Sequence, residues 1–173
     1  MPSSGSWGGD GWFNHVDYNE PALGEYAYHT ILHEIGHALG LKHGHETDVY
    51  GALPSDHDTI EYTVMTYRPY VGAPATGYTY ETFGAPQSLM IDDIAALQYM
   101  YGANFNTQSG NTVYSFSATT GEMMINGVGQ GAPVDNVVFR TIWDGGGTDT
   151  YDFSNYADNL TVSLEAGGWT TLS

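Results

Sequence analysis

Apolar side chains recur at helical spacing in two stretches of this chain. The first runs from about Gly24 to Leu39 and would place five apolar residues on one helix face, namely Ala27, Ile31, Ile35, Ala38 and Leu39. The second runs from about Leu89 to Tyr101, with Ile94, Leu97 and Tyr101 toward a core and Gly102 as its terminator. The pattern therefore predicts two helices.

The remaining sequence predicts short strands and loops. Gly11 to Tyr18 has the pattern of one short strand, whereas the polar residues 44–62 and the Gly-, Pro- and Tyr-rich residues 67–86 predict irregular loops. From Asn111 onward, short β-like stretches alternate with Gly, Asn and Asp turns, at residues 112–116, 137–143 and 160–164. The predicted fold class is α+β, with a boundary near residues 102–110.

The first predicted helix carries a histidine pattern that can hold a metal ion. His33 and His37 are four residues apart, so they lie on the same helix face, and Glu34 can reach a water on an ion held there. Gly40 accepts the left-handed conformation that ends a helix, and this turn would bring His43 back to the ion. Three imidazoles leave a coordination position open, which is typical of catalytic zinc.

A His-Glu-x-x-His pattern alone arises by chance in many helices. Here five positions are fixed at the required offsets, the three histidines together with Glu34 and Gly40, and a chance match of that kind is rare. The segment therefore predicts a catalytic zinc site.

With the methionine turn at Thr63-Val64-Met65-Thr66-Tyr67, the chain resembles the metzincins, and among them the serralysins, which are bacterial secreted zinc proteases. The resemblance implies that Met65 forms an apolar floor under the histidines. It also implies that Tyr67 is a further zinc ligand that swings away to stabilise the oxyanion. Astacin-like members also have the tyrosine, but they usually carry disulfides, and this chain has no cysteine. Met65 taken alone would be interpreted as a core methionine.

The resemblance continues downstream. Asp92 to Gln98 and Tyr101 to Asn104 resemble the closing helix of the catalytic domain, and Gln108 to Tyr114 and Trp143 to Phe153 resemble the start of a calcium-binding domain. It implies that residues 1–104 are the C-terminal part of a metzincin catalytic domain. Residues 105–173 would then begin an RTX-like calcium-binding β-roll or β-sandwich domain.

Asp144 to Asp152 is an imperfect copy of the Gly-Gly-x-Gly-x-Asp-x-apolar-x repeat. Its glycines would aim carbonyl oxygens at a calcium ion and its aspartates would supply charge, although one copy can also be a plain glycine-rich turn. The resemblance implies seven calcium-binding residues, Gln108, Gly110, Thr112, Asp144, Gly146, Gly147 and Asp149. Gly147 and Asp149 would also contribute to a second, incomplete site.

Charge and composition limit the classes of binding partner that the chain can have. The 173 residues include three basic and twenty acidic ones and carry a formal net charge of -17, which argues against nucleic acid and anionic membrane surfaces and suits cation binding. No apolar run spans a membrane, and residues 1–6 lack the features of a signal peptide. The resemblance implies a secreted, extracellular protein, although the family's export signal is not in this chain.

The remaining histidines are interpreted as supporting or surface residues. His29 lies one turn before His33, and a position behind the metal site or at the surface is preferred to a role as fourth ligand. His15, His45 and His57 are expected to be exposed or locally hydrogen-bonded.

The resemblance implies a zinc endopeptidase acting on extended polypeptides, with Glu34 as general base and Tyr67 sharing the oxyanion charge with Zn²⁺. The alternative is a catalytically silent fragment that binds zinc and calcium, because the sequence ahead of the zinc helix can hold at most one strand of the family's N-terminal sheet. A missing N-terminal segment or a proteinaceous inhibitor would be a further partner beside the polypeptide substrate.

Overall fold

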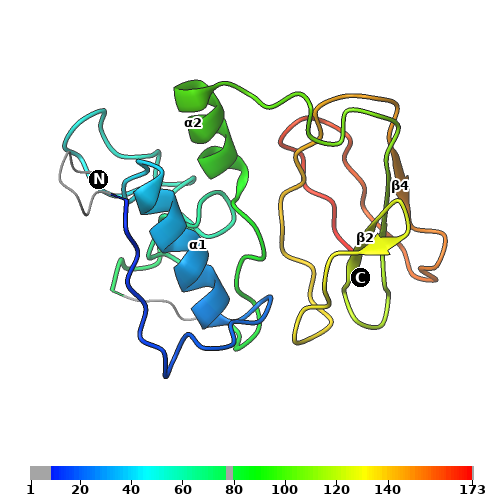
Figure 1. The fold of residues 1–173 in the computed structure, drawn as a ribbon, viewed down its shortest axis with the longest axis horizontal. Helices are drawn as coiled ribbons and strands as arrows, with labels where there is room; N and C mark the ends of the chain where they lie inside the picture. Colours follow the sequence, from blue (N-terminus) through cyan, green and yellow to red (C-terminus); the bar gives the residue numbers. More distant parts are fainter. Residues whose placement is uncertain (1–8, 77–79, 173) are drawn as a thin grey trace.

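The computed structural model describes residues 9–76 and 80–172. Within these ranges the helices are α1 (Tyr26–Ala38) and α2 (Ile91–Tyr101), and the strands are β1 (Val113–Phe116), β2 (Met123–Ile125), β3 (Val128–Gly129) and β4 (Thr150–Asp152). The helices lie in one half of the molecule and the strands in the other (Figure 1). This order confirms the α+β class. No helix in the described ranges is long and apolar enough to cross a bilayer.

Both predicted helices are confirmed, and so are the glycines that end them. After α1, the Leu41 N–H donates to the Gly36 carbonyl at 2.9 Å and the Gly40 N–H donates to the His37 carbonyl at 3.0 Å. With Gly40 at φ 101°, these bonds form a Schellman motif, which only glycine adopts without strain. Gly102, at φ 86°, ends α2 as predicted, but without a Schellman motif: its N–H donates to the Gln98 carbonyl at 2.9 Å.

The predicted core face of α1 is wrong in part, because Ala27, Ile31 and Ala38 are half-buried whereas Ile35 and Leu39 are exposed. Ile35 and Leu39 are 44% and 37% exposed, whereas the buried residues of α1 are His29, His33 and Gly36. The periodicity located an apolar stripe correctly, but the stripe that packs inward is the one carrying histidine and glycine. Imidazoles can be buried there because backbone carbonyls of the neighbouring loop accept their N–H groups.

The face of α2 is partly as predicted. Leu97 packs against the core, but Tyr101 is 67% exposed, and its hydroxyl donates to the Leu39 carbonyl at 2.7 Å. The fully buried position of α2 is Asp93. An acidic residue in the first turn can be buried when it caps the helix, since it accepts the unpaired N–H groups there.

Two apolar clusters form the core. The first cluster lies in the half of the molecule that holds the helices. Its four buried residues are Leu41, Val64, Met65 and Met90, and they pack against Leu32, Leu89, Ala96, Leu97 and Phe139. The second cluster lies in the half that holds the strands. Its three buried residues are Tyr114, Phe116 and Met123, and they pack against Ile125, Val138, Ile142, Phe153, Tyr156 and Leu172. Phe139 belongs to the strand half yet packs in the first cluster, so the two halves share apolar contact.

The sheet has the order β3-β2-β1-β4, with β1 antiparallel to β2 and parallel to β4. Strands β2 and β3 form a hairpin closed by Asn126 and Gly127, at φ 52° and 77°, the positive values of a type I′ turn. This hairpin was not predicted. Strand β4 lies at the end of the predicted repeat, so the repeat does carry a strand.

Three predicted strands are wrong or incomplete. Residues 11–18 and 137–143 are fully described and contain no strand, and residues 160–164 contribute one bridge, between Thr161 and Thr171. Residues 137–143 bond to a loop and not to a strand: the Gln87 N–H donates to the Phe139 carbonyl at 2.9 Å. The loops predicted at 44–62 and 67–86 are confirmed in their described parts, and residues 77–79 and the N-terminal residues 1–6 lie outside the described residues.

Candidate metal centre

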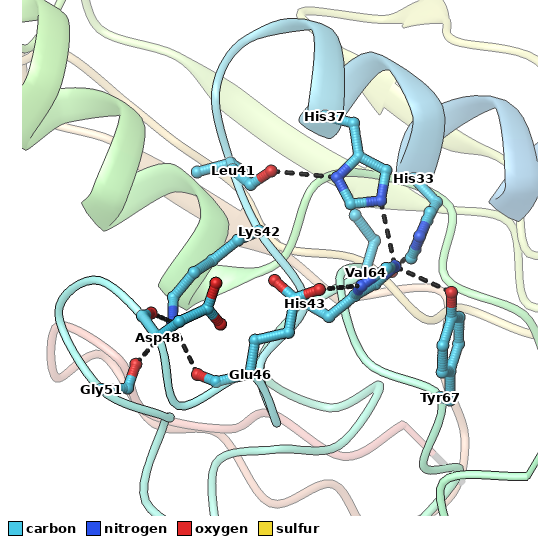
Figure 2. A network of polar contacts seen from close by, with 10 residues as sticks. All are labelled: His33, His37, Leu41, Lys42, His43, Glu46, Asp48, Gly51, Val64 and Tyr67. Carbon is cyan, nitrogen blue, oxygen red and sulfur yellow. Dashed lines mark hydrogen bonds and ion pairs between the residues drawn. The ribbon is translucent and has the colours of Figure 1, made fainter. Parts of the chain in front are cut away.

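Three histidines converge at the end of α1. His33 and His37 project from the helix, His43 returns after the Gly40 turn, and their ligating nitrogens lie within 4.8 Å of one another (Figure 2). The Nε2 atoms of His37 and His43 are 3.1 Å apart. The Tyr67 hydroxyl lies 2.8 Å from the same Nε2 of His43. The structure thus brings together all four residues predicted to bind zinc.

Nδ1 of each helix histidine meets a backbone carbonyl, which leaves Nε2 of each ring for an ion. Nδ1 of His33 lies 2.7 Å from the Val64 carbonyl oxygen, and Nδ1 of His37 lies 3.0 Å from that of Leu41. Because a carbonyl only accepts, Nδ1 carries the proton and Nε2 carries the lone pair. Two nitrogens on one tetrahedral zinc ion lie roughly 3.3 Å apart. The donor set therefore fits zinc.

Burial shifts the pKa values of two side chains at the site. It lowers the pKa of His33 below its ordinary value, so the imidazole is neutral near pH 7. It raises the pKa of Tyr67, and the negative charge of Glu34 raises it further. The Tyr67 phenol therefore keeps its proton and can act as a hydrogen-bond donor.

Glu34 is solvent-exposed on α1 and lines an open depression together with His37 and His43. The acidic side chains of Asp10, Glu46 and Asp48 line the same depression. A carboxylate in this position is accessible to water beside the histidine nitrogens without belonging to the histidine triad. This is the arrangement predicted for a general base.

Met65 lies directly behind α1. Its side chain is 2% exposed, and a Cβ on Gly36 would overlap the Met65 sulfur, so only glycine allows this approach. The Met65 carbonyl accepts from the Gly44 N–H at 3.1 Å, which ties the methionine turn to the residue after His43. The methionine therefore contacts both segments that supply histidines.

Met65→Ala is expected to lower the free energy of unfolding by about 2–5 kcal/mol, because it leaves a cavity in a fully buried site. Met65→Leu nearly conserves volume and is expected to cost less than about 1.5 kcal/mol. Urea unfolding of both variants and the wild type measures the difference. Equal losses for alanine and leucine would show that packing at this site does not depend on volume.

His29 lies behind the site, as preferred from the sequence, and it is buried. Its Nε2 lies 3.4 Å from the Val64 carbonyl oxygen that also meets His33, and its Nδ1 lies 3.1 Å from the Tyr80 hydroxyl. Burial lowers the pKa of His29 to about 4, so the ring is neutral. It therefore adds no positive charge behind the histidine triad.

The other histidines agree with their interpretation in two cases. His15 is exposed, and the His57 side chain is 42% exposed, with Nδ1 2.8 Å from Oδ2 of Asp92, a residue far away in the chain. His45 is partly buried and stacks on the His43 ring, at a centroid distance of 5.4 Å and an interplanar angle of 15°. It is neither exposed nor an additional member of the triad.

Asp93 supports the site and was not predicted to do so. Its carboxylate accepts from the Thr63 hydroxyl at 2.5 Å, from the Val64 N–H at 2.8 Å and from the Met90 N–H at 2.9 Å. It thereby caps α2 and fixes the turn whose Val64 carbonyl meets His33. Burial raises the pKa of Asp93 to about 6. The sequence signal was an acidic residue near the start of a predicted helix.

The predicted calcium-binding segments lie side by side. The Thr112 N–H donates to Oδ1 of Asp149 at 2.9 Å, and a Cβ on Gly147 would overlap the Gly110 carbonyl. Gln108 adopts φ 47°, a left-handed conformation that redirects its carbonyl. The backbone of the loop at residues 108–112 therefore packs closely against the glycine-rich turn.

The oxygen atoms in this region suit calcium only in part. The carbonyls of Gln108 and Gly110 approach the Thr112 hydroxyl at 3.5 and 3.0 Å, so these oxygens converge. The Thr112 carbonyl accepts from the Thr150 N–H at 2.8 Å. Asp144 accepts from the Tyr114 hydroxyl at 2.6 Å and from the Gly146 N–H at 2.8 Å. These carboxylate and carbonyl groups retain further lone pairs for a cation.

The structure places three histidines where their ligating nitrogens could hold one metal ion, and comparison with known proteins shows which family the chain is similar to. The family described as Peptidase M10 serralysin C terminal matches residues 103–172. The chain is 35% identical to Serralysin G of Dickeya chrysanthemi, over 96% of this chain and 34% of that protein. It is 37% identical to Serralysin of Proteus mirabilis, over 98% of this chain and 35% of that protein. It is 34% identical to Metallopeptidase AprA of Pseudomonas marginalis, over 95% of this chain and 36% of that protein.

The chain is therefore similar to the serralysins over nearly its whole length, as its motifs indicated, and residues 103–172 match the C-terminal domain of that family. It spans about a third of the length of the curated relatives that it matches.

Proposed function

We propose that His33, His37, His43 and Tyr67 bind Zn²⁺ and that the site hydrolyses peptide bonds in extended polypeptides outside the cell. The observation that supports this most strongly is the convergence of the three histidines, with His37, His43 and Glu34 lining one open depression. In this account residues 1–104 belong to a catalytic domain and residues 105–173 begin a calcium-binding domain.

Each side chain has one role in the proposed reaction. A bound zinc ion supplies Lewis acidity, which lowers the pKa of a coordinated water toward about 7. Glu34 accepts a proton from the attacking water and returns it to the leaving amine. Tyr67 donates its hydroxyl proton in a hydrogen bond to the oxyanion, and its raised pKa keeps that proton in place.

The second candidate is metal binding without hydrolysis. It is favoured by the exposed Ile35 and Leu39 near the end of α1, an apolar surface that a further segment supplied in trans or a proteinaceous inhibitor could cover. The two candidates share the zinc site and differ only in whether substrate is cleaved.

A casein digestion assay with and without a chelator tests the proposal. Digestion that the chelator stops and added Zn²⁺ restores supports hydrolysis at this site. A chain that holds zinc but leaves casein intact at all concentrations supports the silent alternative.

We also propose that Ca²⁺ binds between residues 108–112 and the turn at Asp144 to Asp149. Ca²⁺ at about 100 times its dissociation constant would stabilise the wild type by about 2.7 kcal/mol. Asp149→Ala is expected to lose this effect, because it removes a carboxylate from the cluster. Thermal unfolding with and without millimolar Ca²⁺ measures it, with the exposed Asp158→Ala as control.

In the control the calcium effect should remain. Equal melting temperatures for the wild type and Asp149→Ala, each with and without Ca²⁺, would show that the segment is only a glycine-rich turn.

A further inference from the structure

Lys42 organises the loop that follows His43. Its ammonium group donates to three backbone carbonyls, those of Glu46 at 2.6 Å, Asp48 at 2.8 Å and Gly51 at 2.7 Å (Figure 2). An ammonium group has three N–H donors, and each of them finds an acceptor here. In a chain with three basic residues, one is thus used to hold this loop around a single cation.

The same loop presents a carboxylate to the metal site. Oε1 of Glu46 lies 2.9 Å from Nδ1 of His43, on the side of the ring opposite to the nitrogen that faces His37. The Nδ1 atoms of His33 and His37 meet neutral carbonyls instead. A carboxylate partner fixes the tautomer and orientation of a metal-binding histidine and makes its other nitrogen more basic.

His43 needs such a partner more than the other two histidines do. His33 and His37 are placed by the hydrogen-bonded backbone of α1, whereas His43 comes after the Gly40 turn, outside any helix or strand. Its Nε2 must stay within reach of His37 at 3.1 Å and of Tyr67 at 2.8 Å. Rotation of the His43 ring would break both contacts at once.

We propose that Glu46 is a positioning residue for His43, and that Lys42 acts on the metal site through Glu46 by holding the loop that carries it. The proposal rests on the proposed zinc site. It predicts that the affinity for zinc depends on a carboxylate that does not touch the ion, and on a lysine that touches neither the ion nor a histidine side chain.

Zinc affinity, measured by competition with a chromophoric chelator, tests the role of Glu46. Glu46→Ala is expected to weaken Zn²⁺ binding about 10–100-fold, the usual effect of removing such a partner. Glu46→Gln keeps an acceptor oxygen but loses the charge, so we expect a smaller loss. The exposed Glu61→Gln makes the same chemical change away from the site and should bind zinc like the wild type.

Lys42→Met tests whether Lys42 affects zinc binding by holding the loop that carries Glu46. Alone it should weaken zinc binding less than Glu46→Ala does. In the double variant Lys42→Met/Glu46→Ala the affinity should equal that of Glu46→Ala, because two residues that act in series are not additive. Thermal unfolding of metal-free Glu46→Ala and Glu46→Gln should match that of the metal-free Glu61→Gln control, which separates positioning from a general loss of structure.

The outcomes separate this proposal from the zinc site itself. If the wild type and Glu46→Ala bind zinc within twofold of each other while His43→Ala binds weakly, the zinc site stands and the positioning role is wrong. Additive losses of zinc affinity in the double variant would show that Lys42 does not act through Glu46. A wild type that binds no zinc would overturn both proposals.

Discussion

Glu34→Ala is expected to remove peptide hydrolysis while leaving zinc bound. Glu34 lines the depression beside His37 and His43 but is not one of the residues whose ligating atoms converge. Loss of a positioned general base typically lowers a rate about 10²–10⁴-fold. Casein hydrolysis gives the rate, and elemental analysis of the same sample gives the zinc content.

The exposed Glu61→Ala serves as the matched control and should retain both activity and zinc. Glu34→Ala protein that contains no zinc would assign Glu34 as a ligand or as a structural residue, and its role as a base would then be wrong.

Tyr67→Phe should keep zinc and lower the rate by about 10²-fold, the typical loss for one oxyanion donor. The three histidines suffice to hold the ion, and the phenyl ring preserves the stacking of Tyr67 on His33, at 5.8 Å and 18°. What disappears is the hydroxyl that lies 2.8 Å from Nε2 of His43. Steady-state hydrolysis and zinc content are measured together.

Tyr70→Phe removes an exposed hydroxyl from the same loop and should behave like the wild type. An unchanged rate in Tyr67→Phe, in a chain that hydrolyses casein, would remove Tyr67 from the mechanism.

The parts of the site that could be predicted depend on local geometry. The spacing of His33 and His37 follows from the helical repeat, and the return of His43 follows from a glycine at the Schellman position, so sequence alone sufficed. The two helices were predictable for the same reason. Tyr67 required the family resemblance, because nothing local to Tyr67 indicates that its hydroxyl reaches His43.

Contacts between distant segments could not be predicted. Periodicity located the apolar stripe of α1, but it could not show that the face with His29 and Gly36 is buried while Ile35 is exposed. The stretch at 137–143 has strand-like residues, yet its partner is the loop at Gln87, so no ladder forms. Strand patterns record side-chain preference and not the identity of the neighbour.

Two supporting contacts were missed for different reasons. Asp93 had a recognisable signal at the start of α2, but its bond to the Val64 N–H joins residues far apart in the chain. Glu46 and Lys42 had no signal, because their contacts depend on the path of an irregular loop. The Asn126-Gly127 turn did have one, since Asn-Gly favours a type I′ hairpin.

The central claim is that His33, His37 and His43 together bind one zinc ion. Elemental analysis of the purified chain, refolded with excess Zn²⁺ and then desalted, tests it most directly. The account predicts one equivalent of zinc in the wild type and a loss of most of that zinc in His37→Ala, with the exposed His15→Ala unchanged. A full equivalent of zinc in His37→Ala, or none in a folded wild type, would contradict the account.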